Sequence, residues 1–273
     1  RKTRPKKTRT RKAVKMKILE IDAGNTRIKW RLLEYSNQQV EKIKFDSVLA
    51  PGLVGEMPDS LSQQLHELKE EGIEKIRASN VRGDDFAKLL SLFCESNFSV
   101  NVNYALVSAE LAGLKNAYQD FETLGVDRWL AMLAAFRSAK SAVCVVDCGS
   151  AITIDLVNAD GQHEGGFIVP GLQLMQRSLG EHTANLKYHP HSNINIEPGT
   201  NTAVAINHGV LLMALGLLEK VEQHWGLNRS WYLTGGDAAI LSSFIKWQHE
   251  VNSELVMDGL GIADDNSRSS IKD

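Results

Sequence analysis

The chain has 273 residues, of which 43% are hydrophobic and 23% charged, and these proportions exclude a protein that is disordered throughout. Residues 1–15 hold nine Lys or Arg and no acid, so removing these nine from the formal net charge of −2 leaves −11 on the rest. An acidic globule thus carries a basic segment. The segment could contact nucleic acid or a membrane surface, but a charge block without aromatic residues is typical of a disordered tail, which we expect.

The sequence predicts a cytoplasmic protein without a membrane or nucleic-acid partner. The long apolar run at 210–218 is too short to cross a bilayer, and no apolar segment precedes Met16 to form a signal peptide. Three cysteines without a spacing framework indicate reduced thiols. Cys144 and Cys148 lie four residues apart in one expected strand, roughly 13 Å from each other and too far for a disulfide.

In the first half of the chain, strands alternate with helices. Residues 17–21 and 27–33 predict two strands joined by a tight turn. The elements expected next are a helix at 59–71, a strand at 74–79, a helix at 86–94 and a strand at 99–104. This alternation favours an α/β architecture.

A second unit is expected to begin at residue 123. It opens with a helix at 129–137, followed by strands at 142–146 and 152–157. The remaining expected elements are helices at 172–179 and 202–224, a strand at 231–234, a helix, and a last strand at 254–257. We therefore expect domains at 16–122 and 123–263, with a polar tail at 264–273.

The two halves begin alike. Ile18-Leu-Glu-Ile-Asp22-Ala-Gly24-Asn-Thr26 resembles Val143-Cys-Val-Val-Asp147-Cys-Gly149-Ser-Ala151, each a buried strand followed by Asp-x-Gly and a small polar residue. A polyphosphate needs glycine for close backbone approach, short polar side chains as donors, and a carboxylate for Mg²⁺. One copy could be an ordinary hairpin turn. Two copies after two buried strands favour a pair of phosphate-binding loops.

Other nucleotide-binding motifs are absent from the sequence. It contains no Gly-x4-Gly-Lys-Ser/Thr loop and no Gly-x-Gly-x-x-Gly, which disfavours P-loop kinases and Rossmann dehydrogenases. Thr234-Gly-Gly-Asp237 follows an apolar strand. It could lie flat against adenine, or it could be a strand-to-helix turn with Asp237 as the N-cap. His189 and His191 are read as solvated loop residues.

Asp127 is the candidate general base of a kinase, because a carboxylate near the γ-phosphate can remove the proton of an attacking hydroxyl. The adjacent Arg128 could pair with an anionic acceptor through its planar fork. The alternative is that Asp127 caps a helix. Composition alone favours the cap.

Together these motifs resemble type III pantothenate kinases, in the superfamily of acetate and sugar kinases, Hsp70 and actin. The resemblance runs from residue 18 to 263 and rests on the order of its motifs, which are Asp22-Ala-Gly-Asn-Thr-Arg-Ile-Lys29, Leu124-Gly-Val-Asp-Arg-Trp129, Asp147-Cys-Gly-Ser-Ala-Ile-Thr153, Gly165-Gly-Phe-Ile-Val-Pro-Gly171, Asn201-Thr202 and Thr234-Gly-Gly-Asp237. It implies two similar ribonuclease-H-like domains with an ATP cleft between them, the actin-like ATPase fold. The implied reaction is phosphorylation of the 4′-hydroxyl of pantothenate by ATP, the first step of coenzyme A biosynthesis.

The resemblance also assigns residues. It implies that Asp127 is the catalytic base and that Asp147 binds a monovalent cation, K⁺ or NH₄⁺, in addition to the Mg²⁺ that accompanies ATP. The implied ATP-binding residues are Asp22, Ala23, Gly24, Asn25, Thr26, Arg27, Ile28, Lys29 and Ser150. The implied pantothenate-binding residues are Tyr118, Gly125, Val126, Asp127, Arg128 and Thr202. A homodimer with the acceptor site near the subunit contact is implied as well.

The chain departs from the family pattern in its second loop, where Cys148 and Ser150 replace the usual leucine and threonine; the serine keeps the hydroxyl. The basic residues 1–15 have no counterpart in the family. Two alternatives stay open. One is a non-catalytic regulatory relative, since some members carry the name Bvg accessory factor, and the other is a kinase for a different hydroxyl. Asp127 and Arg128 argue against the first, and Tyr118 with residues 125–128 against the second.

Overall fold

The computed structural model describes residues 15–36, 39–50, 55–180 and 195–269, and side chains up to residue 264. Most of the basic segment predicted at 1–15, together with His189 and His191, lies outside the described residues. Lys15 is described and is the first residue of the first strand, so the expected tail ends one residue earlier than predicted.

The first half forms one five-stranded sheet in the order β3-β2-β1-β4-β5. β1, β2 and β3 run antiparallel, and β4 and β5 follow in parallel. The strands are β1 (Lys15–Ala23), β2 (Arg27–Ser36), β3 (Gln39–Leu49), β4 (Ile73–Asn80) and β5 (Val102–Tyr104). The helices are α1 (Asp59–His66), with a short 3-10 turn after it, and α2 (Asp84–Phe98). The predicted elements are confirmed here. β3 was missed, as was the short strand pair β6 (Glu110–Leu111) and β7 (Leu114–Lys115).

The second half repeats this topology in a sheet of order β10-β9-β8-β11-β12. Its strands are β8 (Val143–Cys148), β9 (Ala151–Val157), β10 (His163–Pro170), β11 (Ser230–Thr234) and β12 (His249–Val251). Its helices are α3 (Val126–Ala139), α4 (Leu172–Gly180), α5 (Thr202–Val221) and α6 (Ala238–Ser242). Two sheets of one topology confirm the predicted fold class, an α/β protein with two similar ribonuclease-H-like halves. Cys94, Cys144 and Cys148 are buried free thiols, as expected.

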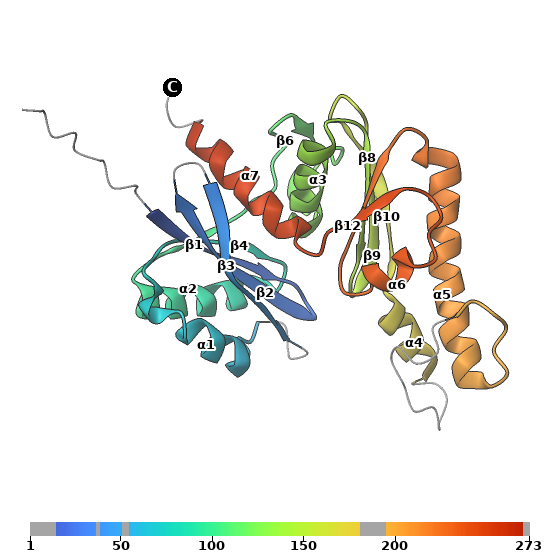
Figure 1. Cartoon of the computed structure of the whole chain (residues 1–273), viewed down its shortest axis with the longest axis horizontal. Helices are drawn as coiled ribbons and strands as arrows, with labels where there is room; N and C mark the ends of the chain where they lie inside the picture. The colour runs from blue at the N-terminus through green and yellow to red at the C-terminus, as the bar shows by residue number, and fades with distance from the viewer. Residues whose placement is uncertain (1–14, 37–38, 51–54, 181–194, 270–273) are drawn as a thin grey trace, which may run out of the picture.

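The layers alternate through the molecule (Figure 1). α1 and α2 cover one face of the first sheet, and α4, α5 and α6 cover the outer face of the second. Between the sheets lie α3 and the last helix, α7 (Leu255–Ser269). Their apolar faces form a third core with β8 and β11, so the two halves share a packed interior.

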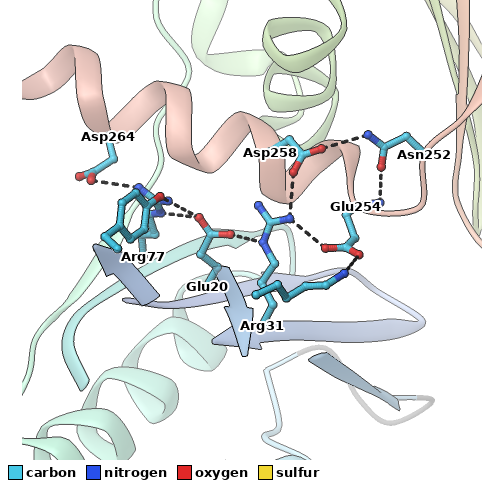
Figure 2. A network of polar contacts seen from close by, with 9 residues as sticks. Glu20, Arg31, Arg77, Asn252, Glu254, Asp258 and Asp264 are labelled. Atoms are coloured by element: carbon cyan, nitrogen blue, oxygen red, sulfur yellow. Dashed lines mark hydrogen bonds and ion pairs between the residues drawn. The ribbon is translucent and has the colours of Figure 1, made fainter. Parts of the chain in front are cut away.

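α7 also docks on the first sheet through buried charges. Glu20 on β1 faces Arg31 on β2 and Arg77 on β4, because these residues are direct cross-strand neighbours. Its carboxylate, fully buried, accepts from both guanidinium groups. The arginines then reach acidic residues of α7 and the turn before it (Figure 2). Arg31 binds Glu254 and Asp258, at 2.9 and 2.8 Å, and Arg77 binds Asp264 at 3.2 Å.

Two predictions near the C-terminus are wrong. Residues 255–257 open α7 and Glu254 lies in the turn before it, so residues 254–257 form no strand, and the last strand is β12. α7 also continues to Ser269, past the expected start of a polar tail at 264. The expectation that the apolar run at 210–218 is too short to cross a bilayer also needs correction. The whole helical stretch Thr202–Gly226, which contains this run, is long and apolar enough to do so by length and composition. Core helices of soluble proteins pass that same test.

Candidate active site

The turns that follow β1 and β8 meet at one place. The hydroxyls of Thr26 and Ser150, 124 residues apart in sequence, lie 2.5 Å from each other and form a hydrogen bond. Each turn follows a buried strand and precedes an antiparallel partner, as the sequence echo predicts. The two Asp-x-Gly loops are therefore parts of a single site.

A third turn closes against the second loop. Gly235, after β11, has φ +92°, and a Cβ on it would lie 2.4 Å from Oδ1 of Asp147. Only glycine permits this approach. Two residues later, Asp237 donates its backbone N–H to the carbonyl of Cys148 at 2.9 Å. Asp237 occupies the cap position of α6 without a side-chain capping bond, so the predicted N-cap role is positional only.

The charge of Asp127 affects the pKa values of two buried carboxylates from other segments, Asp22 and Asp147. Burial raises the pKa of Asp22 to about 6, and the charge of Asp127 adds to this while Lys29 opposes it. Burial also raises the pKa of Asp147 to about 7, again with Asp127 and Asp22 adding and Lys29 opposing. The Nζ of Lys29 donates to the carbonyl of Ser253 at 2.8 Å. Such a cluster attracts cations, and it would repel a polyphosphate that arrived without one.

Asp127 lies in the first turn of α3, next to the cap residue Gly125. Its Oδ1 accepts the backbone N–H of Arg128 at 2.8 Å. A Cβ at residue 125 would lie 2.6 Å from that oxygen, so glycine is needed beside this carboxylate. Burial raises the pKa of Asp127, although the bond from Arg128 lowers it. A carboxylate with a raised pKa is a stronger base once it is ionised.

The guanidinium of Arg128 is already engaged. Its Nε and Nη2 bind the two carboxylate oxygens of Asp155 on β9, at 2.9 and 2.5 Å, and its Nη1 donates to the hydroxyl of Tyr118 at 3.2 Å. Burial alone would raise the pKa of Asp155, but the bonds from His163 and Arg128 bring it below its usual value. The edge of the guanidinium formed by Nε and Nη2 therefore binds Asp155, and this edge is not free to pair with an anionic acceptor. Only the ends of Nη1 and Nη2 keep donors for a ligand.

His163 completes this network. Its Nδ1 lies 3.4 Å from the backbone N–H of Ala117 and accepts from it, so the ring carries its proton on Nε2 and donates to Asp155 at 3.1 Å. Its ring stacks on Tyr118, with centroids 6.0 Å apart and planes at 14°. Asp155 on β9 and His163 on β10 thus fix the positions of Tyr118 and Arg128.

Comparison with known proteins decides the family. The sequence model of the type III pantothenate kinase family matches residues 18–224. The chain belongs to this family. A type III pantothenate kinase of Pseudomonas fluorescens is 37% identical over 254 residues, which cover 90% of this chain and 98% of that protein. The relative from Azotobacter vinelandii is 36% identical over 259 residues, with the same coverage.

Type III pantothenate kinases transfer phosphate from ATP to pantothenate in coenzyme A biosynthesis, and this chain is an ATP-dependent enzyme of that kind. A solved structure from Campylobacter jejuni, described as a transcriptional activator of the Baf family, has a TM-score of 0.58 and 22% identity. The match covers 92% of this chain and 99% of that one. At this identity the likeness concerns the fold alone.

Within this pantothenate kinase, the ATP-binding and pantothenate-binding residues predicted from sequence do not all lie together at the site where the two loops meet. Arg27 donates to the hydroxyl of Ser47 on β3, and Ala23 and Ile28 are buried within the sheet. Val126 opens α3, next to the base candidate. Thr202, the first residue of α5, is exposed, and no hydrogen bond among the described residues joins it to the rest of the site.

Three further residues of the kinase were missed from sequence: Arg82, Asp155 and His163. Asp155 left a usable signal, since it interrupts the apolar strand Ile152-Thr-Ile-Asp-Leu and a buried carboxylate needs a partner. His163 and Arg82 stand in turn-like sequence that gives no such sign. No group of three or more His, Cys, Asp or Glu side chains that could hold a metal is found in the described part of the chain.

Proposed function

We propose that ATP binds where the two Asp-x-Gly loops meet, in a cleft between the halves, with residues 22–29 holding its phosphates and Ser150 contacting them from the second loop. Pantothenate lies beside Tyr118 and residues 125–128. The contact between Thr26 and Ser150 carries this proposal, because it brings both loops together. The charge of Asp127 raises the pKa values of both Asp22 and Asp147, which supports Asp127 as the proposed base close to these carboxylates.

In the proposed reaction Asp127 takes the proton of the 4′-hydroxyl of pantothenate while the oxygen of that hydroxyl attacks the γ-phosphorus of ATP. The bond between that phosphorus and the β–γ bridging oxygen breaks, leaving ADP and 4′-phosphopantothenate. Arg128, neutralised by Asp155, offers oriented donors to pantothenate rather than a mobile charge. The raised pKa of Asp127 suits it for this proton.

The carboxylates fit the cations that we propose. Mg²⁺ usually takes one or two protein carboxylates and completes its shell with substrate phosphates and water. Asp22 is its proposed protein contact, and bound Mg²⁺ would neutralise charge on the phosphates. We propose Asp147 for K⁺ or NH₄⁺, because this carboxylate sits between the second loop and Gly235.

We also propose a homodimer formed through α5. The outward face of this helix is made of apolar or small residues that are exposed, namely Ala205, Gly209, Leu212, Met213 and Gly216. Figure 1 places α5 at the outer edge of the second half. A second copy is the expected cover for so apolar a face. Thr202 begins the same helix, which gives it a route to an acceptor site at the subunit contact.

We keep the domain boundaries at 16–122 and 123–263 as part of the proposal, with α7 as the segment that returns to the first sheet. A cytoplasmic location is proposed because ATP and the enzymes that use it in metabolism are found there.

Purified protein with ATP, Mg²⁺, K⁺ and pantothenate tests the assignment of the base. Wild type should form phosphopantothenate, and Asp127→Asn should lose at least a hundredfold in kcat, because it removes the base and keeps the shape. Asp120→Asn, at an exposed aspartate earlier in the same segment of sequence, is the matched control and should have the kcat of wild type. Full turnover by Asp127→Asn would refute the base. No product from wild type in K⁺ or NH₄⁺ would favour the non-catalytic regulatory alternative.

A further inference from the structure

The first Asp-x-Gly loop is held from behind by a continuous set of donors. The carbonyl of Ala23 accepts the N–H of Val81 at 3.1 Å, and the carbonyl of Thr26 accepts the N–H of Ala50 at 2.9 Å. Between them, the carbonyls of Gly24 and Asn25 accept from Nη1 of Arg82, at 3.3 and 2.8 Å. Four successive carbonyls therefore all accept hydrogen bonds from protein donors, the middle two from Arg82.

Arg82 is itself firmly placed. Asn80 fixes its main chain, accepting the N–H of Arg82 at 3.0 Å and donating to the carbonyl of Gly83 at 2.9 Å. The guanidinium lies over the ring of Phe86, with Cζ 5.2 Å from its centroid. The same Nη1 also reaches the carbonyl of Ala50 at 3.3 Å. Arg82 is 1% exposed, so no ligand in the site can touch it.

The direction of the carbonyls determines the direction of the amides. In a planar trans peptide the C=O and the following N–H point in opposite directions. Because Arg82 draws the carbonyls of Gly24 and Asn25 behind the loop, the N–H groups of Asn25 and Thr26 face the other way. Both residues are exposed. Successive N–H groups that face one space form a concavity suited to anions.

We infer that Arg82 is a positioning residue of the nucleotide site, which fixes the two peptides of the first loop so that their N–H groups are presented to the phosphates of ATP. This inference rests on the proposed role of residues 22–29 as the phosphate loop. Arg82 acts through the loop and not by direct contact. Its loss weakens the binding of nucleotide and leaves the binding of pantothenate intact.

Arg82→Met keeps an unbranched side chain and removes every guanidinium donor, and Arg82→Lys keeps the charge without the fork. We expect Arg82→Met to raise the KM for ATP and the dissociation constant of MgADP, from thermal-shift titration, by tenfold or more. The KM for pantothenate should stay within twofold, and kcat at saturating ATP should be largely kept. Arg82→Lys should fall between Arg82→Met and wild type.

Arg77→Met is the matched control. Arg77 is also a buried arginine, 3% exposed, on the strand that leads to Arg82, and its partners are Glu20, Tyr35 and Asp264. Arg77→Met should lower the melting temperature and leave the affinity for MgADP within twofold of wild type. The inference is overturned if Arg82→Met, or Arg82→Lys should the first variant fail to fold, binds MgADP like wild type. It is overturned equally if Arg77→Met weakens MgADP as much. A wild-type protein that binds no MgADP would refute the phosphate loop itself.

Discussion

At the scale of single residues, the carboxylates of the site favour function over stability. Asp22 and Asp147 have raised pKa values, near 6 and 7, because they are buried close to other acids. Their ionised forms, which bind cations, are thus disfavoured by the folded protein alone. Without nucleotide or metal, this arrangement makes folding depend on pH in an unusual direction.

The sign follows from proton binding. Between the pKa of an unfolded aspartate, about 3.9, and the raised folded value, the folded state binds more protons, so stability falls as pH rises. We therefore expect Asp147→Asn to gain melting temperature relative to wild type, in ligand-free protein, as pH increases from 5 to 8. The difference between the two proteins at each pH is the quantity to measure. A difference that does not change with pH would show that Asp147 is not protonated in the folded state near neutrality.

The sequence was a good guide to residues whose chemistry is local. Asp22, Gly24 and Ser150 follow strands in a pattern that an anion site requires, so each could be predicted without its neighbours. Asp155 and His163 matter through contacts with Arg128 and Tyr118, which depend on how β9, β10 and α3 pack. Spacing along the chain carries no record of such contacts. The binding roles of the predicted residues stay predictions.

At the scale of elements, α7 was the principal error. Residues 254–257 include Leu255-Val-Met257, a short apolar run whose period does not separate a buried strand from a buried helix. These three side chains are buried, and the first two pack with α3 in the core between the sheets. The acidic residues of the same helix then meet Arg31 and Arg77, which no local pattern could indicate.

Glu20 should be the most costly residue to change in this network. Glu20→Gln leaves two guanidinium groups facing a neutral amide at a fully buried position, and we expect it to lower the free energy of unfolding by about 3 kcal/mol. Glu254→Gln is the control, because its side chain is 19% exposed and Arg31 keeps Glu20 and Asp258. Glu254→Gln should lower the free energy of unfolding by much less. Urea unfolding with an unchanged slope measures both, and equal losses would mean that burial of Glu20 is unimportant.

At the scale of the whole molecule, the repeat was visible in the sequence because both halves use the same strand-turn-strand opening. The long apolar helix α5 was also predicted, but its exposure was not. Which face of a helix stays bare depends on what packs against it. Here one side of α5 packs on the second sheet, and among the described residues of one copy the other side stays exposed at Leu212 and Met213.

A charge placed on the bare face should separate the proposed dimer. Leu212→Glu, at a side chain that is 53% exposed, would bury an unpaired carboxylate at the contact. We expect the mass measured by light scattering after gel filtration to fall to that of one chain, with loss of activity if Thr202 acts across the contact. Leu92→Glu, at a 61% exposed leucine on α2, is the control and should stay dimeric. A wild type that runs as a single chain would refute the dimer.

The return of α7 to the first sheet has a consequence for how the protein is made. Arg77 leaves the ribosome 187 residues before Asp264, which at about 5–20 residues per second is a delay of roughly 10–40 seconds. Throughout that interval the nascent N-terminal half exposes Glu20, Arg31 and Arg77 without the helix that covers them. All strands of the first sheet are synthesised before those of the second, but α7 can cover the first sheet only after the second sheet has been made. The half that is synthesised first is then among the last to be finished.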